Sequence, residues 1–271
     1  MSLTYLAKEI TIYGGLILVI IGIIGNGINV LVFSTFRNYR TTPCSFYFLI
    51  ASIFNIIYVT INLISRIVSA GFGFDLTQTS ISWCKIRNFS VCTFSLITLT
   101  CSCLATIDQF FATSRSANIR RLSNIKWAQR IVIIVIIIWC LHDVPVILFD
   151  NISPITKTCV ITNTGLSVYS IVYLFALICG FPSLTMMTFG YLTYRNIHLT
   201  RALAEQQADR QLAKMTLIQV FLVVISNVPY SVFVAYSLIT SGISKSINQL
   251  IIEGFTITIL ALVVYLYFTV G

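Results

Sequence analysis

Long apolar runs separated by short polar stretches dominate the chain. The runs cover Ile10–Phe36, Cys44–Ala70, Ile81–Thr113, Trp127–Phe149, Gly165–Tyr194, Lys214–Ile239 and Ile247–Val270. Each run contains the roughly 20 residues that a helix needs to cross a bilayer core, and each is far longer than a membrane-spanning β-strand of about ten residues. Because backbone groups in lipid must be hydrogen-bonded internally, the pattern predicts helices. We therefore expect an all-α, seven-transmembrane helix bundle that forms a single domain over residues 1–271.

The composition leads to the same class of protein. Of the 271 residues, 57% are hydrophobic and only 9% are charged, whereas a soluble domain has about a quarter of its residues charged. This excludes a soluble enzyme, a disordered chain and a secreted module held by disulfides. No internal repeat is visible, which disfavours a transporter built from inverted repeats.

The basic residues separate the connections into two sets. Eleven of the 17 flank the connections between helices 1 and 2, 3 and 4, and 5 and 6: Arg37, Arg40, Arg115, Arg120, Arg121, Lys126, Arg130, Arg195, Arg201, Arg210 and Lys214. The positive-inside bias predicts that these connections are cytoplasmic, with the N-terminus extracellular, in a multi-pass protein of the plasma membrane. The net charge of +9 does not indicate nucleic-acid binding, because the charges flank apolar helices instead of covering one soluble face.

Two features of the predicted outer side agree with this orientation. The segment Met1–Glu9 is short and has neither a basic stretch nor a small-residue cleavage site, so the first helix is interpreted as an uncleaved signal anchor. Asn151 begins an Asn-Ile-Ser triplet in a connection on the same side, and we expect it to be glycosylated.

The eight cysteines fall into two groups. Six lie in apolar runs and are interpreted as small buried hydrophobes: Cys44, Cys92, Cys101, Cys103, Cys140 and Cys179. Cys84 and Cys159 both lie at the predicted outer face, in the oxidising compartment where a disulfide between them would persist. No Cys-x-x-Cys pair or histidine cluster is present, so no metal or other cofactor is expected.

Several short motifs occur in register with the seven runs. The third run begins with Trp83-Cys84 and ends with Asp108-Gln109-Phe110, and 24 residues separate Cys84 from Asp108. The remaining motifs are Gly25-Asn26, Ala51-Ser52-Ile53-Phe54-Asn55, Trp139 with Pro145, Phe181-Pro182 and Ser226-Asn227-Val228-Pro229-Tyr230. In this order and spacing, the set resembles rhodopsin-like (class A) G-protein-coupled receptors over nearly the whole chain, and in its details the divergent orphan receptors of invertebrates.

The resemblance implies an activation switch at the inner end of the third helix. In the family, the acid at Asp108 restrains an adjacent arginine, and Gln109 stands in place of that arginine here. Asp209 lies 20 residues before Pro229, where many relatives carry the acidic partner on helix 6. A contact between Gln109 and Asp209 would be a charge-assisted hydrogen bond, so we expect a weaker lock and higher basal signalling or weaker coupling. The alternative is that both acids only cap or solvate helix ends.

Two further switch positions depart from the family. Asn55 replaces the aspartate that holds sodium in relatives, which predicts weak or absent sodium modulation. Asn227 stands near Pro229 where the family usually has a tryptophan, which leaves the helix 6 part of the switch undefined. The chain also reaches Val270-Gly271 without the family's Asn-Pro-x-x-Tyr, so the sequence is expected to be either a fragment or an unusual receptor.

The predicted ligand pocket lies below Cys84. Arg87, Val91 and Ser95 recur every four residues and therefore share one helical face. Val91 occupies the position at which amine receptors have an aspartate, which argues against an amine ligand, and helix 7 has no lysine to hold retinal. The polar candidates are interpreted as ligand-binding or, alternatively, as packing residues. With Val91, the predicted pocket comprises Arg87, Val91, Ser95, Asn227, Tyr230 and Glu253.

The expected partners are an extracellular ligand, either a peptide or a small chemosensory molecule, a heterotrimeric G protein and the lipid bilayer. The predicted G-protein contacts are Arg115, Arg120, Arg121, Arg210 and Lys214, with anchoring to anionic lipid as an equal alternative. A seven-helix chemosensory ion-channel subunit remains the alternative function, and it would have its N-terminus inside. No enzymatic activity is expected, because no carboxylates or histidines cluster at one depth. His142 and Asp143, in the fourth run, are expected to pair with backbone or water.

Overall fold

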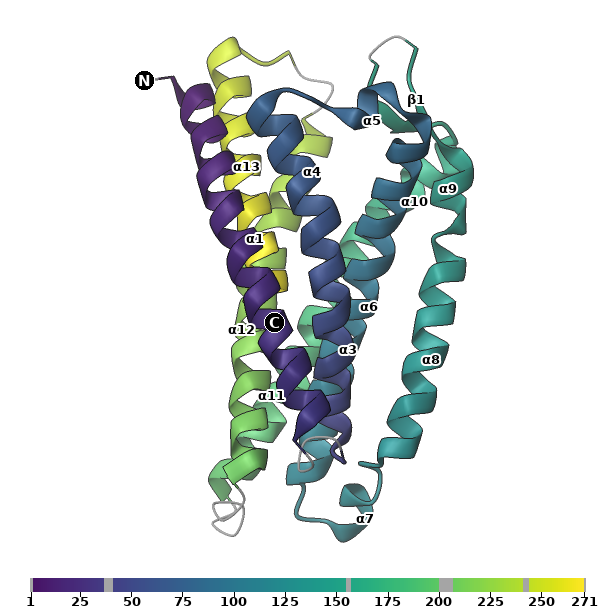
Figure 1. Ribbon diagram of the computed structural model, residues 1–271, viewed down its shortest axis with the longest axis vertical. Coiled ribbons are helices and arrows are strands. Elements are labelled where there is room, and N and C mark those ends of the chain that lie inside the picture. The colour runs from purple at the N-terminus through teal and green to yellow at the C-terminus, as the bar shows by residue number, and fades with distance from the viewer. Residues whose placement is uncertain (1, 37–40, 155–156, 200–206, 241–243, 271) are drawn as a thin grey trace.

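Seven long apolar helices run side by side and form a bundle (Figure 1), and each is long and apolar enough to cross a membrane. The computed structural model describes residues 2–36, 41–154, 157–199, 207–240 and 244–270, apart from the side chains of 198–199, 207–210 and 238. The spans are Leu3–Thr35, Pro43–Gly71, Ile81–Thr113, Ile125–Phe149, Thr164–Ile197, Gln211–Ser237 and Ile247–Val270. The protein is thus a helical multi-pass membrane protein, and all seven runs predicted from the sequence form helices.

Four spans are single helices, namely α1 (Leu3–Thr35), α6 (Ile81–Thr113), α12 (Gln207–Ile239) and α13 (Ile247–Val270). The second span comprises α3 (Pro43–Tyr58), η1 (Val59–Leu63), α4 (Ile64–Arg66) and η2 (Ile67–Gly71), and the fourth comprises α8 (Ile125–His142) and α9 (Val144–Phe149). The fifth comprises α10 (Thr164–Val172), η3 (Tyr173–Gly180) and α11 (Phe181–Leu199). The segments η1, η2 and η3 are π-helical.

Polar side chains cap the first turns of α1 and α6, and α1 extends beyond its apolar run. The first helix begins at Leu3, seven residues before the predicted Ile10, and Ser2 accepts a hydrogen bond from the backbone of Tyr5. Ser80 caps α6 in the same way by accepting from the backbone of Trp83 at 3.3 Å. These oxygens satisfy backbone N–H groups that a helix start leaves unpaired. Hydropathy does not detect such turns, so the predicted first boundary was too late.

The third span, α6, lies inside the bundle. Two thirds of its most apolar stretch, 67%, is buried, a larger share than in any other described span. Its buried face carries many small residues that let neighbouring helices approach closely: Ser90, Thr93, Ser95, Thr98, Ser102 and Thr106. It packs against α3, α8, α11 and α12. By contrast, α1 and α8 expose isoleucines such as Ile20, Ile24, Ile134 and Ile138, as expected for surfaces that face lipid tails.

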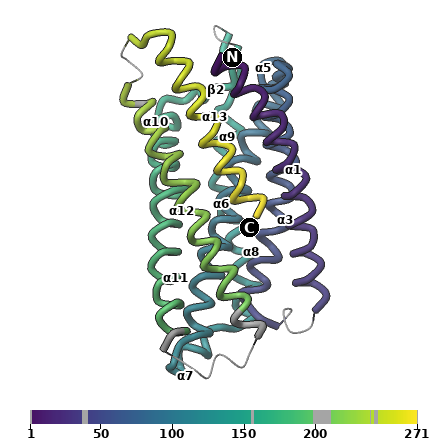
Figure 2. The backbone as a smooth tube through the Cα atoms, turned by 90° about the vertical axis from the view of Figure 1, so that its left-hand side faces the viewer, coloured from purple at the N-terminus to yellow at the C-terminus, as the bar shows by residue number. Residues whose placement is uncertain are grey.

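The two ends of the bundle differ in structure. At the upper end in Figure 1, the short helix α5 (Leu76–Thr79) lies near an antiparallel pair of strands, β1 (Asp150–Ile152) and β2 (Cys159–Ile161). At the lower end, the short helix α7 (Ala117–Arg120) connects α6 to α8. Figure 2 shows α13 descending beside α1 from the upper end.

Candidate functional site

A cavity of about 270 Å³ lies in the upper half of the bundle, among the second, third, fifth, sixth and seventh spans. Five of the predicted pocket residues line it: Arg87, Val91, Ser95, Asn227 and Tyr230. The structure therefore brings together residues that are up to 143 positions apart in the sequence, counting from Arg87 to Tyr230. Apolar side chains of Leu99, Ile178, Val264 and Phe268 complete much of the wall.

The spacing on α6 explains one wall of this cavity. Arg87, Val91 and Ser95 lie one turn apart on a continuous helix, so they form a column that faces the same side. The hydroxyl of Ser95 donates to the carbonyl of Cys92 on its own helix at 2.9 Å. The amide of Asn227 reaches across from α12 to the carbonyl of Ile178 at 3.4 Å.

Five further polar residues line the cavity and were not among those predicted from the sequence: Tyr58, Arg66, Asn88, Tyr173 and Tyr265. Arg66 lies in α4, between η1 and η2. A signal for it was available, because an arginine within an apolar run is a functional candidate by default. Tyr173 is the first residue of η3, so the π-helical stretch of the fifth span reaches the cavity wall. Arg66 lies between η1 and η2, so both π-helical stretches of the second span lie next to the wall.

Glu253 does not line the cavity, and its prediction as a pocket residue is corrected by its contacts. Its carboxylate forms an ion pair with Lys245 at 2.7 Å and accepts hydrogen bonds from Tyr236 at 3.0 Å and Gln249 at 3.3 Å. The ion pair ties α13 to the connection that precedes it, and the hydrogen bond from Tyr236 ties α13 to the end of α12. Gln249 lies four residues before Glu253 on the same helix, and the two side chains are therefore neighbours. The hydrogen-bonding capacity of the Glu253 carboxylate is used by these local partners.

The disulfide between Cys84 and Cys159 is present, as the sequence analysis predicted. It joins the first turn of α6 to β2, next to Asn88, which donates to Asp150 at 2.7 Å and to the sulfur of Cys159 at 3.2 Å. Burial raises the pKa of the Asp150 carboxyl, although the hydrogen bond from Asn88 and the charge of Lys85 lower it in part. The strand pair is thereby fixed over the upper end of α6.

The pKa of Asp75, a second acid at the upper end, is shifted in the opposite direction to that of Asp150. Burial by itself would raise the pKa of Asp75, but hydrogen bonds from Thr77 and Ser69 and the charge of Arg87 lower it below its usual value. Asp75 caps α5 by accepting from the backbone of Thr77 at 2.9 Å. Its carboxylate is therefore used by its own short helix.

His142 and Asp143 pair with side chains, whereas the sequence analysis expected backbone or water partners. His142 Nδ1 lies 2.7 Å from the Asp143 carboxylate, and His142 Nε2 lies 2.7 Å from the Tyr169 hydroxyl. Thr93 of α6 donates to the same carboxylate at 2.9 Å. The chain of contacts links the third, fourth and fifth spans beside a smaller cavity of about 140 Å³.

Asn55 takes part in a polar junction between three spans. Its amide donates to Asn26 Oδ1 at 3.1 Å, and the amide of Asn26 donates to the carbonyls of Gly22, Phe268 and Thr269 at 2.9, 3.1 and 3.4 Å. Both asparagines are fully buried. The junction therefore joins α1, α3 and α13 through amide groups, and no formal charge enters it.

The predicted switch residues of α6 are buried in the lower half of the bundle. Asp108 is 6% exposed and Gln109 1% exposed. Asp209 lies in α12, but its side chain is outside the described ones, so its predicted contact with Gln109 stays a prediction. On the same helix Pro229 lies inside a continuous α-helix and is exposed, and Ser226 donates to the carbonyl of Leu222 at 2.6 Å.

The predicted G-protein contacts lie at the lower end of the bundle. Arg115, Arg120, Arg121 and Lys214 are exposed there, and Arg120 donates to the carbonyl of Ser114 at 3.1 Å. Arg210 belongs to α12, with its side chain outside the described part of the structure. At the opposite end, Asn151 is exposed on β1, so its side chain is accessible for glycosylation.

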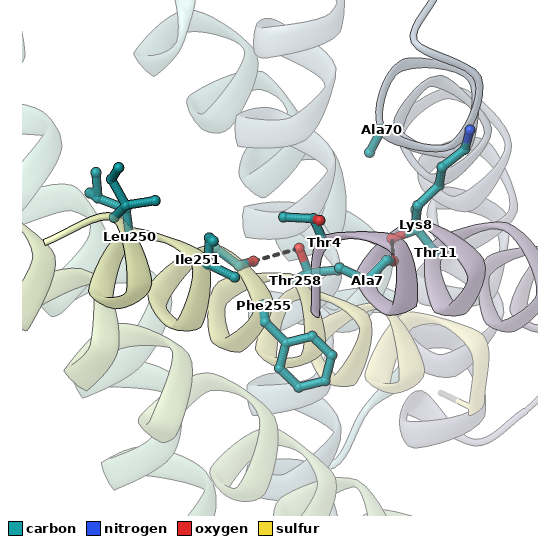
Figure 3. A pocket seen from close by; sticks show the side chains of 11 residues that line it. Thr4, Ala7, Lys8, Thr11, Ala70, Leu250, Ile251, Phe255 and Thr258 are labelled. Carbon is teal, nitrogen blue, oxygen red and sulfur yellow. Dashed lines mark hydrogen bonds between the residues drawn. The ribbon is translucent and has the colours of Figure 1, made fainter. Parts of the chain in front are cut away.

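A larger groove of about 400 Å³ lies between the upper parts of α1 and α13 (Figure 3). Its lining is mostly apolar, and its three helical threonines are already bonded. Thr11 donates to Ala7 and Thr258 donates to Gly254, both at 2.8 Å, and the hydroxyl of Thr4 lies 3.0 Å from that of Ser2. Figure 3 shows Lys8 as the sole labelled charged side chain, and it extends away from the α1 ribbon on the side of Ala70. The groove therefore lacks the converging polar groups that fix a ligand.

No family model matches the chain, and no curated protein matches it. The site is therefore interpreted from its geometry alone. Within the described ranges, no group of three or more histidine, cysteine, aspartate or glutamate side chains is arranged to hold a metal ion.

Proposed function

We propose that the chain is a rhodopsin-like G-protein-coupled receptor of the plasma membrane, with its N-terminus outside and no catalytic activity. The observation that carries the proposal is the cavity among five spans, directly below the disulfide between Cys84 and Cys159. A ligand in such a cavity contacts helices that can move relative to one another. The exposed basic lower end supplies a surface for an acidic face of a G protein.

The proposed mechanism is a shift between two arrangements of the bundle. A ligand stabilises whichever arrangement it binds more tightly, and no bond is made or broken. Asn227 and Tyr230 place α12 in the cavity wall, so a ligand there acts directly on the helix whose lower end is proposed to meet the G protein. The volume of about 270 Å³ favours a small chemosensory molecule over a peptide.

A ligand screen in cells that coexpress each class of G protein tests this proposal. We expect at least one small molecule to activate a G protein, and Leu99→Trp, which fills the cavity, to abolish the response at equal surface expression. Ile137→Trp on the exposed face of α8 is the matched control and should respond normally. A ligand-gated membrane current without G-protein activation would instead identify the seven-helix channel subunit and reject the receptor.

Gln109 provides an independent test at the lower end. If Gln109 forms only a weak lock with helix 6, Gln109→Arg restores the ion pair that the family uses and lowers basal signalling. Basal G-protein activation at equal surface expression is the measurement, with Gln109→Glu as a variant of similar size that cannot form that pair. Equal basal activity in the parent and Gln109→Arg would remove Gln109 from the mechanism.

A further inference from the structure

Two arginines converge on the cavity from adjacent spans. Arg66 of α4 and Arg87 of α6 both line it, and the Nε atom of each is buried without a hydrogen-bond partner. The phenols of Tyr230 and Tyr265 line the same cavity as both arginines. The two guanidinium groups therefore act on one small region of the cavity.

The described carboxylates in the upper half of the bundle are used elsewhere. Glu9 accepts from Tyr5, Asp143 pairs with His142, Asp150 accepts from Asn88, and Glu253 pairs with Lys245. Asp75 caps α5, and the charge of Arg87 lowers its pKa without an ion pair between them. Neither arginine forms an ion pair with a carboxylate in the described part of the chain. The cavity thus carries two positive charges without a neighbouring counter-charge in ion-pair contact.

A guanidinium within a membrane-spanning helix is costly when it has no ion-pair partner, and such residues mark ligand or ion sites by default. A guanidinium offers a planar fork of donors that matches the two oxygens of an acid group. Tyr58, Tyr230 and Tyr265 add phenols in the same wall, while Leu99, Ile178 and Phe268 provide an apolar surface. This combination suits a molecule with an acidic end and an apolar body.

We infer that the cavity binds a small organic anion, with its acid group between Arg66 and Arg87 and its apolar body against Leu99, Ile178 and Phe268. The inference deepens the proposed function, on which it rests for the role of the cavity as the ligand site. It names the chemical class of ligand: an aromatic or aliphatic acid small enough for about 270 Å³.

The test uses the full chain in nanodiscs of zwitterionic phosphatidylcholine. The melting temperature is measured with phenylacetate, phenylacetamide and phenethylamine, and with the corresponding naphthyl compounds, so that only the head group changes within each set. We expect at least one acid to raise the melting temperature with its concentration, because a ligand that binds only the folded state stabilises it. The amides and amines should have no such effect.

Variants connect the effect to the two arginines. Arg66→Gln and Arg87→Gln should each weaken the affinity for the acid about tenfold to a hundredfold, as for a lost hydrogen bond to a charged group. Arg130→Gln, on the exposed surface of α8, is the matched control and should bind like the parent. Arg87→Lys keeps the charge without the planar fork and is expected to bind the acid more weakly than the parent. If a glutamine variant does not fold, the affinity of Arg87→Lys for the acid is the measurement that tests the inference.

Further arms distinguish the sources of the negative charge. Nanodiscs with phosphatidylserine, and inorganic phosphate alone, are compared with the acids. Arginine-dependent stabilisation by the anionic lipid or by phosphate, with none by any acid, would overturn the organic ligand. Equal stabilisation by an acid and its amide, or no stabilisation by any acid, would also overturn it.

The outcome is separable from that of the proposed function. Acid binding that needs Arg66 and Arg87, in a protein that activates no G protein, would reject the receptor and keep this inference. Activation of a G protein by a neutral ligand, with unchanged potency in Arg66→Gln and Arg87→Gln, would reject this inference and keep the receptor.

Discussion

Asn26 and Asn55 show how single amide side chains connect three membrane spans. Each amide group offers both a donor and an acceptor, so Asn55 can bond to Asn26 while Asn26 reaches the backbone of α13. An aspartate at position 55 could accept but not donate, and it would introduce a buried charge. The neutral pair is therefore stable without a bound cation.

The first prediction concerns sodium. The melting temperature of the parent should not depend on whether sodium or choline chloride is present at equal ionic strength. Asn55→Asp should be stabilised by sodium, because the new carboxylate places a charged oxygen beside Asn26 and Ser52. Asn55→Ala is the control: it should be destabilised by about 1–3 kcal/mol in both salts, since it leaves a buried acceptor on Asn26 unpaired. A sodium-stabilised parent would contradict this account.

A second prediction uses the opposite pKa shifts of Asp150 and Asp75. The pKa of Asp150 is raised in the folded protein, so its contribution to stability is complete below the ordinary value of 3.8 and is lost as the pH rises through the folded value. Asp150→Asn keeps an acceptor for Asn88 and should gain in melting temperature relative to the parent as the pH increases above about 4.

Asp75→Asn is the matched comparison for this experiment. The pKa of Asp75 is lowered, so its stabilisation is present above the ordinary value and disappears as the pH falls through the folded value. Its variant should therefore be less stable than the parent at neutral pH, and the difference should vanish in acid. If both variants show the same pH dependence relative to the parent, the assignment of opposite shifts is wrong.

At the scale of elements, the π-helical stretches explain why part of the cavity escaped the sequence analysis. The column Arg87, Val91 and Ser95 follows from regular helical spacing, which the sequence shows directly. Arg66 lies between η1 and η2, and Tyr173 begins η3. In these π-helical stretches each backbone hydrogen bond spans one residue more than in an α-helix, which rotates the side chains that follow. The hydropathy pattern predicts neither this rotation nor the ion pair with Lys245 that holds Glu253 outside the cavity wall.

The contact of α1 with the second span gives a third prediction. A Cβ atom at Gly15 would lie 2.7 Å from Ile67 Cγ1, whereas a Cβ atom at Gly27 would meet nothing within 4 Å. Gly15→Ala should therefore destabilise the protein by about 1–3 kcal/mol through overpacking. Gly27→Ala, on the same helix, should be neutral or stabilising, because alanine favours a helix by about 1 kcal/mol over glycine. Thermal unfolding of both variants is the measurement, and equal effects would contradict the close approach.

At the scale of the whole molecule, the number and place of the seven helices could be predicted because lipid imposes one length and one pattern on every span. The prediction of the disulfide needed only the two cysteines left outside the apolar core of the runs. The cavity required the packing of five spans together, which depends on small residues of α6 and on π-helical stretches that no single run encodes.

The fourth prediction concerns orientation across the membrane. The exposed basic residues of the lower end, among them Arg115, Arg121 and Lys214, should face the cytoplasm. An epitope fused to the N-terminus should therefore bind antibody on intact cells, and Asn151→Gln should remove a glycan that slows migration on a gel. Antibody binding only after the cells are made permeable would reverse the bundle and favour the channel alternative.

The link between Cys84 and Cys159 also constrains how the protein is made. The two residues are 75 positions apart, and the third and fourth spans lie between them. Cys84 therefore cannot form this bond until the ribosome has synthesised both helices and β2 lies at the same end of the bundle. The strand pair over the cavity is consequently a late step of biogenesis, completed after its supporting helices are already in the bilayer.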